Sequence, residues 1–432
     1  FLPQSARLGI QFEDGFYHLL ITTIRVLRRE GIEGIRLRAR HLMASGRQAQ
    51  RSITGSTERE YNEWIQANED DASSAATAQS NIGQFDLQPL ISIVMPVFEP
   101  PPEFLQLAIE SVVNQSYPNW ELCIADDASR EPHVARCLRR FARRDNRIKF
   151  ILREKNEHIA KASNTALTLA TGQYVALMDQ DDLLPPNALY WVVDTINRHP
   201  DVKLIYSDED KIDIRGERSD PYFKTDWNPG LFLSQNMVCH LGVYAHNLVR
   251  QLGGFRQGYE GAQDYDLALR MSEEIAENEI VHIPRVLYHW RQHAQSTALN
   301  AASKEYAVTA GQRVIQDHLD RIGEKATVLI EGTNYRVKYA LPDSGPLVSL
   351  IIPTKNHCEL LRSCMDSIRT TEYDNYEIIV VDNSSDDVST LTYLASLAEQ
   401  PDTRVVRIDD AFNFAALNNL AVKLARGQII GM

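Results

Sequence analysis

The stretch YVALMDQDDLLPP, residues 174–186, joins an apolar run to three aspartates in four positions. The apolar run predicts a strand that is buried on both faces. Asp179, Asp181 and Asp182 follow it directly. Closely spaced carboxylates repel each other unless a cation lies between them. We therefore expect this strand to carry a cation-binding group to the edge of a sheet.

Toward the N-terminus, apolar runs alternate with segments of helical periodicity. The predicted strands cover 90–98, 120–129, 148–156 and 173–179, and the predicted helices cover 102–115, 133–144 and 160–172. We expect Gly172 to stop the last of these helices. The alternation predicts an α/β fold with a mostly parallel sheet and helices on both of its faces. In such sheets, ligands bind outside the carboxyl ends of the strands.

Acids stand at the predicted carboxyl ends of two strands. A carboxylate at Asp126 or Asp127 can accept a hydrogen bond from the N3–H of uracil or thymine, although DDAS is also a natural turn sequence. The DxD pattern after the fourth strand indicates a divalent cation that bridges protein and diphosphate. Alternatively, Asp181 or Asp182 caps a helix beginning near Pro185.

Composition narrows the class of protein. The 432 residues predict two or three domains, and 44% hydrophobic with 24% charged residues are typical of a soluble globular protein. A net charge of −13 disfavours nucleic acid as a partner. Five scattered cysteines without a CxxC pair indicate reduced thiols in the cytoplasm. Neither a membrane-spanning run nor a signal peptide is expected from the sequence.

The N-terminal segment, residues 1–51, is basic. Eight arginines and two glutamates fall between Arg25 and Arg51, with apolar residues at helical spacing. This pattern predicts an amphipathic helix that lies on an anionic membrane surface or docks on protein. Residues 52–88 read as a linker, within which Tyr61 and Trp64 form one short helical face.

The chain contains an internal repeat. PLISIVMPVF at 89–98 recurs as PLVSLIIPTK at 346–355, and WELCIADDAS recurs as YEIIVVDNSS, which sets Asp382 opposite Asp126. The repeat predicts a tandem duplication whose second copy, residues 346–432, is present only as its first half. We expect the natural chain to continue. Residues 301–345 predict a helix followed by a hairpin that turns at Gly332, together an ordered spacer.

Two further stretches carry polar side chains suited to chemistry. In YEGAQDYDLALR, Asp264 either caps a helix or takes a proton from an attacking hydroxyl. LYHWRQHAQST supplies a cluster that can ligate a metal, stack on a sugar, neutralise phosphate, or simply pack around its tryptophan. Its members are His289, Trp290, Arg291 and His293.

Together, SIVMPVF, IADDAS, ASNTALTLATGQYVALMDQDD, YSDEDKID, FKTDWNPGLFLSQNM, GAQDYDL and LYHWR resemble the family-2 glycosyltransferases of the GT-A fold. The chain looks most like bacterial enzymes that build O-antigen or capsule with tandem transferase domains. The resemblance covers 89–300 fully and 346–432 in part. The QxxRW motif of processive, membrane-embedded synthases is absent.

The resemblance implies roles for particular residues. Asp264 is the implied catalytic base, although Gln263 replaces the glutamate that usually precedes it. Mg²⁺ or Mn²⁺ is the implied cofactor, held by Asp179, Asp181 and His289. The implied donor-binding residues are Pro96, Val97, Glu99, Asp126, Asp127, Asn164, Asp179, Gln180 and Asp181. The implied acceptor-side residues are Asp182, Trp290, Arg291 and His293.

The implied reaction is a single inverting displacement on a UDP- or dTDP-sugar. The implied acceptor is a growing, lipid-linked glycan, and the implied location is the cytoplasm, with peripheral contact to the inner membrane or to other assembly enzymes through residues 1–51. A sugar nucleotidyltransferase is a rival, but VFEPPPEF after the first strand lacks that class's Gly-rich basic loop. A catalytically silent scaffold is the second rival.

Overall fold

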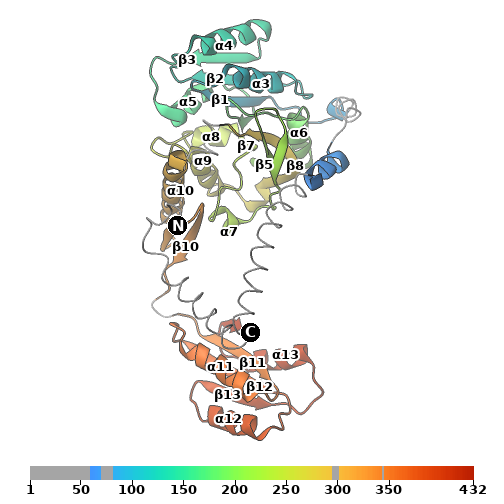
Figure 1. Ribbon diagram of the computed structural model, residues 1–432, viewed down its shortest axis with the longest axis vertical. Coiled ribbons are helices and arrows are strands. Elements are labelled where there is room, and N and C mark those ends of the chain that lie inside the picture. Colours follow the sequence, from blue (N-terminus) through green and yellow to red (C-terminus); the bar gives the residue numbers. More distant parts are fainter. Residues whose placement is uncertain (1–58, 70–80, 294–300, 343–344) are drawn as a thin grey trace, which may run out of the picture. The chain divides into compact units, whose positions relative to one another are not determined.

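The computed structural model describes residues 59–69, 81–293, 301–342 and 345–432 (Figure 1). These residues form two compact units, of which the first ends at Lys338 and the second spans Tyr339–Met432. The basic segment predicted over residues 1–51 lies outside the described residues. Within the described ranges, no helix combines the length and hydropathy needed to cross a lipid bilayer.

The first unit is built on one mixed sheet in the order β3-β2-β1-β4-β7-β5-β6, with β8 paired to β5. The first four strands run parallel, and β7 is antiparallel to both β4 and β5. The expected α/β class with a mostly parallel sheet is therefore confirmed. The strands are β1 Ile91–Val97, β2 Trp120–Asp126, β3 Ile148–Leu152, β4 Tyr174–Leu177, β5 Leu204–Ile212, β6 Arg218–Tyr222, β7 Gly242–Ala245 and β8 Ile280–Arg291.

Both faces of this sheet are covered, because neighbouring residues of a strand point in opposite directions. On β1, Ile93 and Met95 pack in the main core with Ile109 of α3, whereas Val94 packs in a second cluster with Ala166 of α5. The helices of the first unit are α3 Pro102–Val113, α4 Pro132–Arg144, α5 His158–Leu167, α6 Ala188–Arg198, α7 Pro229–Phe232, α8 His246–Gln251, α9 Gln263–Ser272, the short 3₁₀ helix Glu277–Glu279, and α10 Ala301–Arg321.

Two predicted helix boundaries are wrong. Helix α5 ends at Leu167, not at Gly172. Gly172 serves a close approach instead, since a Cβ there would lie 2.3 Å from the backbone oxygen of Leu90. Helix α6 begins at Ala188 and not near Pro185, so neither Asp181 nor Asp182 caps it.

The segment expected to be a spacer belongs to the first unit. Helix α10 packs on α9, and the two-stranded hairpin β9 Ala326–Glu331 and β10 Asn334–Tyr339 packs on α10 (Figure 1). Val314, Ile315 and Leu319 of α10 are fully buried in the main core. The predicted turn at Gly332 is confirmed, with the glycine in a left-handed conformation.

Part of the predicted linker is also ordered. Residues 59–68 are helical, as the spacing of Tyr61 and Trp64 predicted. The Trp64 and Phe223 rings lie 4.6 Å apart between centroids, and Tyr61 is buried. This short helix therefore docks beside β6 of the first unit.

The second unit repeats the first half of the first. Its sheet has the order β13-β12-β11-β14, the counterpart of β3-β2-β1-β4, and all its strands run parallel. The predicted duplication is therefore visible in the topology. Its elements are β11 Val348–Thr354, α11 Cys358–Arg369, β12 Tyr376–Asp382, α12 Val388–Ala398, β13 Thr403–Arg407, α13 Phe414–Leu424 and β14 Ile429–Gly431.

Candidate functional site

A large cleft opens at the carboxyl ends of the parallel strands in the first unit. Its volume is about 1780 Å³. The parallel register of β1, β2 and β4 places their ends together, which is where α/β sheets bind ligands. The predicted site residues that line it are Pro96, Val97, Asp127, Asp179, Gln180, Asp181, Asp264 and Trp290. Aspartates from three separate segments thus meet in one cleft.

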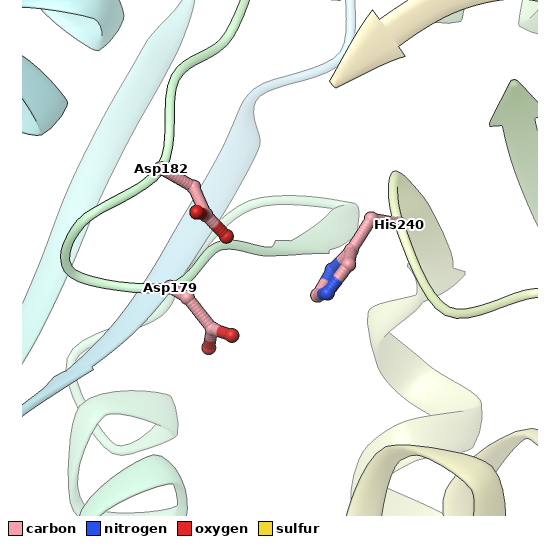
Figure 2. A group of neighbouring side chains, drawn as sticks. All are labelled: Asp179, Asp182 and His240. Atoms are coloured by element: carbon pink, nitrogen blue, oxygen red, sulfur yellow. The ribbon is translucent and has the colours of Figure 1, made fainter. Parts of the chain in front are cut away.

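The loop after β4, residues 179–182, lies at the centre of this site. Ligand atoms of Asp179, Asp182 and His240 lie within 4.8 Å of one another and could hold a metal ion (Figure 2). Burial raises the pKa of Asp179 to about 6; His240 opposes the rise, and Asp181 adds to it. Burial and the neighbouring aspartates likewise raise the pKa of Asp182. Such crowding disfavours ionised carboxyls and favours a bound cation.

His240 was not predicted as a site residue. It follows the NM of the FKTDWNPGLFLSQNM motif by three positions, but no periodicity or spacing distinguishes it in the sequence. The buried Lys224 ammonium donates to the His240 carbonyl and pairs with Glu209, so these two residues hold the histidine's backbone. The buried His240 Nδ1 has no hydrogen-bond partner within the described residues. A nitrogen left in this state is a suitable metal ligand.

The two histidines of the LYHWRQH cluster have different partners. His293, expected on the acceptor side, lies beside the acid loop, with Nε2 2.6 Å from Asp181 Oδ2. His289, expected as a metal ligand, instead has Nδ1 2.5 Å from Asp210 Oδ1. Asp210 also accepts hydrogen bonds from Tyr61 and Arg218. His289 is therefore engaged in a buried network, and the histidines that neighbour the loop carboxylates are His240 and His293.

Asp264 lies in the first turn of α9, whose N-cap residue is Ala262. Asp264 is therefore not the N-cap residue, and the capping alternative does not hold. Instead, Asp264 Oδ2 accepts a hydrogen bond from Asn236 Nδ2 at 2.7 Å, and the residue lines the cleft. One carboxylate oxygen is thereby fixed, while the side chain stays at the cleft surface.

At the end of β2, Asp127 rather than Asp126 faces the cleft. Asp127 pairs with Arg153 and accepts the Glu157 backbone N–H at 3.1 Å. Asp126 Oδ1 accepts the Ser129 backbone N–H at 3.2 Å, as the turn interpretation of DDAS predicted. Asp126 is thus engaged in the turn, whereas Asp127 is the member of the pair that lines the cleft.

Other predicted residues lie outside the cleft lining. The lining drawn from the described residues does not include Glu99, Asn164, Asp182, His289, Arg291 and His293. Asp182 and Arg291 are both 1% exposed, and the Arg291 backbone N–H donates to Asp182 at 2.7 Å. Asn164 exchanges hydrogen bonds with the Phe255 backbone. These side chains shape the loops that carry the cleft surface.

The mostly parallel sheet of the first unit carries acids and histidines at a large cleft along its carboxyl edge, which is where α/β folds bind ligands. The profile described as Glycosyl transferase family 2 matches residues 92–253 and 349–432, which cover more than half of the sequence and correspond to both copies. The chain belongs to this family, as the sequence motifs predicted.

Several proteins of known sequence are similar to the chain. The Uncharacterized protein y4gI of Sinorhizobium fredii is 47% identical over 80% of the chain and 38% of its own length. O-antigen biosynthesis protein RfbC of Myxococcus xanthus is 37% identical over 86% of the chain and 29% of its own length. The chain therefore spans less than two fifths of either relative.

Among solved structures, S. aureus TarS 1-349 in complex with UDP-GlcNAc is 18% identical, with a TM-score of 0.43 over 53% of the chain and 66% of its own length. A mannosyltransferase of Pyrobaculum calidifontis in complex with GDP-Man and Mn²⁺ is 15% identical, with a TM-score of 0.36 over 58% of the chain and 82% of its own length.

Proposed function

We propose that the first unit is an inverting, metal-dependent glycosyltransferase that moves a sugar from a UDP- or dTDP-sugar to a surface polysaccharide. The observation that carries the proposal is the single cleft lined by Asp127, Asp181 and Asp264. These residues come from three different elements, and each suits a different part of the reaction. A surface in which acids merely cap helices would not need them in one place.

A divalent cation fits the donor set of the acid loop. Carboxylate oxygens are the ligands that Mg²⁺ and Mn²⁺ prefer. Asp179 and Asp182 offer such oxygens beside His240, which has a buried nitrogen without a partner among the described residues, and Asp181 lines the cleft next to them. His293, beside Asp181, is a second nitrogen within reach of this loop. When bound, such a cation stabilises the negative charge that develops on a departing nucleotide diphosphate.

The nucleotide end of the donor fits the other side of the cleft. We assign Asp127 as the acceptor of the base N3–H, with its carboxylate oriented by Arg153. Arg130 and Lys155, which line the cleft nearby, supply positive charge for the donor. The charge of this end therefore suits a uridine or thymidine diphosphate.

Asp264 is the proposed base. Asn236 donates to one of its oxygens, which leaves the other oxygen to take the proton of an attacking hydroxyl. The hydroxyl oxygen then forms the new bond to the anomeric carbon while the bond to the diphosphate breaks on the opposite face, so the configuration inverts. The anomeric centre passes through an oxocarbenium-like state, as in glycoside hydrolysis.

The acceptor class is proposed from relatives. RfbC, a protein of O-antigen biosynthesis, is 37% identical to the chain. We propose a growing, lipid-linked glycan as acceptor, reached at the cytoplasmic face of the inner membrane. Attachment through the basic residues 25–51 belongs to the same proposal.

The test is the release of nucleoside diphosphate from a panel of UDP- and dTDP-sugars, with Mg²⁺, with Mn²⁺ and with a chelator. We expect at least one donor to be turned over only with metal. Asp181→Ala should lower that rate at least 100-fold, whereas the matched variant Asp86→Ala, at an exposed acid outside the cleft lining, should match the unchanged protein. Full activity in Asp181→Ala would refute the proposal.

A further inference from the structure

One wall of the cleft comes from segments that follow the transferase match, whose first part ends at residue 253. Helix α10 contributes Tyr306 and Val308, and the β9–β10 hairpin contributes Thr333 and Tyr335. These residues stand on the same side as Asp264. The wall therefore lies beyond the first stretch that the family profile matches.

This wall is fixed to the rest of the unit. Gly311 of α10 has no room for a side chain, because a Cβ there would lie 2.0 Å from the Tyr335 hydroxyl. That hydroxyl donates to the Val308 carbonyl at 3.1 Å. The Tyr335 backbone N–H donates to Ser234 at 2.9 Å, which ties the hairpin to the loop after α7. Ala310, Val314, Ile315 and Leu319 of α10 also pack in the main core, so the wall is part of the folded unit before any ligand binds.

The direction of the reaction assigns this wall to the acceptor. The ends of β1 and β2 and the start of α5 line the part of the cleft that we assigned to the nucleotide, and Asp179 and Asp181 line the part that we assigned to the diphosphate. Asp264 lies in the first turn of α9, the helix that packs on α10. An acceptor hydroxyl that gives its proton to Asp264 must therefore belong to a molecule lying against the α10 wall.

The chemistry of the wall suits a sugar ring. Tyr306 is 48% exposed, and its ring lies over Gly261, where a Cβ would approach to 2.8 Å. An aromatic face that is held from behind and open in front packs well against the C–H face of a pyranose. Trp290 and Tyr222 also line the cleft.

The charge at this end disfavours an anionic acceptor. Lys224, Arg218 and Lys211 neutralise Glu209, Asp210 and Asp220. Within the described residues, no ion pair joins Glu260 or Asp264 to a cation, although both line the cleft. Carboxylates left in this state accept hydrogen bonds from sugar hydroxyls and repel a uronic acid or a phosphate.

We propose that α10 and the β9–β10 hairpin form an acceptor subsite for a neutral pyranose residue, with Tyr306 as its stacking surface. This inference rests on the proposed function, since it takes Asp264 as the base. It adds the chemical class of the sugar that receives the transferred group, and it names the structural elements that select it.

The test is saturation-transfer NMR on the full chain with UDP and Mg²⁺. The probes are the methyl glycosides of rhamnose, galactose and glucose, with methyl glucuronide as the charged match of the glucoside. We expect a signal from at least one neutral glycoside and at least a fivefold weaker signal from the glucuronide. Tyr306→Ala should lower the neutral signal at least fivefold, Tyr306→Phe should keep it, and Tyr339→Ala, at an exposed tyrosine outside the cleft lining, should leave it unchanged.

Each contrary result is decisive. Absence of a signal from every neutral glycoside, an equal signal in Tyr306→Ala, or a stronger signal from the glucuronide would overturn the subsite. Calorimetry with UDP and Mg²⁺ on the unchanged protein separates the two levels of inference. If neither UDP nor, in a parallel titration, dTDP binds, the proposed function itself fails, whereas nucleotide binding with no glycoside signal removes only the acceptor subsite.

Discussion

At the scale of single residues, the side chain of Tyr288 contacts each residue of the candidate metal group. Its hydroxyl donates to Asp182 Oδ2 at 2.6 Å and accepts the Asp179 backbone N–H at 3.1 Å. Its ring stacks on His240, with centroids 4.3 Å apart and planes 7° from parallel. One buried side chain thus sets the positions of all three residues in the candidate metal group. Asp182 therefore fixes the loop through its hydrogen bonds to Tyr288 and Arg291, while Asp179 and Asp181 line the cleft.

Replacing Asp264 by Asn separates chemistry from donor binding. The amide keeps the shape of the side chain but cannot take a proton, so we expect transfer to fall about 10²–10⁴-fold. Affinity for UDP should change less than about twofold, because Asp264 lies on the acceptor side. Calorimetry with UDP and steady-state rates check both quantities, with the exposed Glu274→Gln as control. A parallel loss of UDP affinity would show that Asp264 serves the donor instead.

At the scale of elements, the same hydrogen-bonded clamp occurs in both units. It consists of a serine, a glutamate and a glycine N–H from three neighbouring segments. In the first unit, Ser92 on β1 donates to Glu121 on β2 at 2.6 Å, and the Gly172 N–H before β4 donates to Ser92 at 2.9 Å. In the second, Ser349 donates to Glu377 at 2.7 Å. The clamp joins three adjacent parallel strands near their amino ends and leaves their carboxyl ends for the ligand.

Gly172→Ala tests how closely these strands must approach. The added Cβ would lie 2.3 Å from the Leu90 oxygen and 2.7 Å from Ser92 Oγ, so we expect a loss of about 1–3 kcal/mol in the free energy of unfolding. All five tryptophans of the sequence precede Lys338, so tryptophan fluorescence in urea reports on the first unit alone. Gly230→Ala, whose Cβ would meet nothing closer than 3.4 Å, should change stability by less than about 0.5 kcal/mol. Equal stabilities of the two variants would contradict this role.

Acid should weaken the second unit through its copy of the clamp. Burial alone would raise the pKa of Glu377, but hydrogen bonds from Ser349 and from the Arg426 backbone and side chain lower it to about 2. The ionised carboxylate therefore stabilises the fold above its ordinary pKa of 4.5, and that contribution is lost as the pH falls from 4.5 toward 2. Glu377→Gln should melt lower at pH 6 and lose less stability between pH 4.5 and 2.

Stability is measured by calorimetry. The second unit contains no tryptophan, so its calorimetric transition is the one that no change in tryptophan fluorescence accompanies. Asp387, whose pKa is also lowered to about 2, remains in the Glu377→Gln variant, so the pH dependence should shrink without vanishing. If the variant and the unchanged protein lose stability equally between pH 4.5 and 2, ionisation of Glu377 does not stabilise the second unit.

Elements were predictable where a local pattern defines them. The four parallel strands and the repeat follow from apolar runs and from self-similarity, and Asp181 and Asp264 follow from acids placed at the ends of strands and helices. His240 did not follow, because it reaches the acid loop only through tertiary packing by Lys224 and Tyr288. The predicted end of α5 was wrong. Gly172 and its counterpart Gly427 are glycines because the neighbouring strand passes too close for a Cβ, and not because they end a helix.

At the scale of the whole molecule, the boundary of the transferase unit lies later than the sequence motifs indicate. The motif LYHWR ends near residue 291, and a helix and hairpin after it resemble a connection between two copies. Long-range contacts decide otherwise. Glu273, the C-cap residue of α9, pairs with both His318 and Arg321 of α10, and Arg256 pairs with Asp317. Such pairings leave no trace in local periodicity.

Truncation at two points tests where the unit ends. A chain that stops after residue 300 loses Val314, Ile315 and Leu319, each fully buried, at about 1.5–3 kcal/mol per side chain. That loss, about 5–9 kcal/mol, is comparable to the whole stability of a domain, so we expect this chain to lose cooperative melting. A chain that stops at Lys338 keeps α10 and nearly all of the hairpin. It should melt within a few degrees of the temperature at which the first unit melts in the full chain. If the shorter chain melts cooperatively at an unchanged temperature, α10 is only a spacer. The proposed acceptor wall is then not part of the transferase unit.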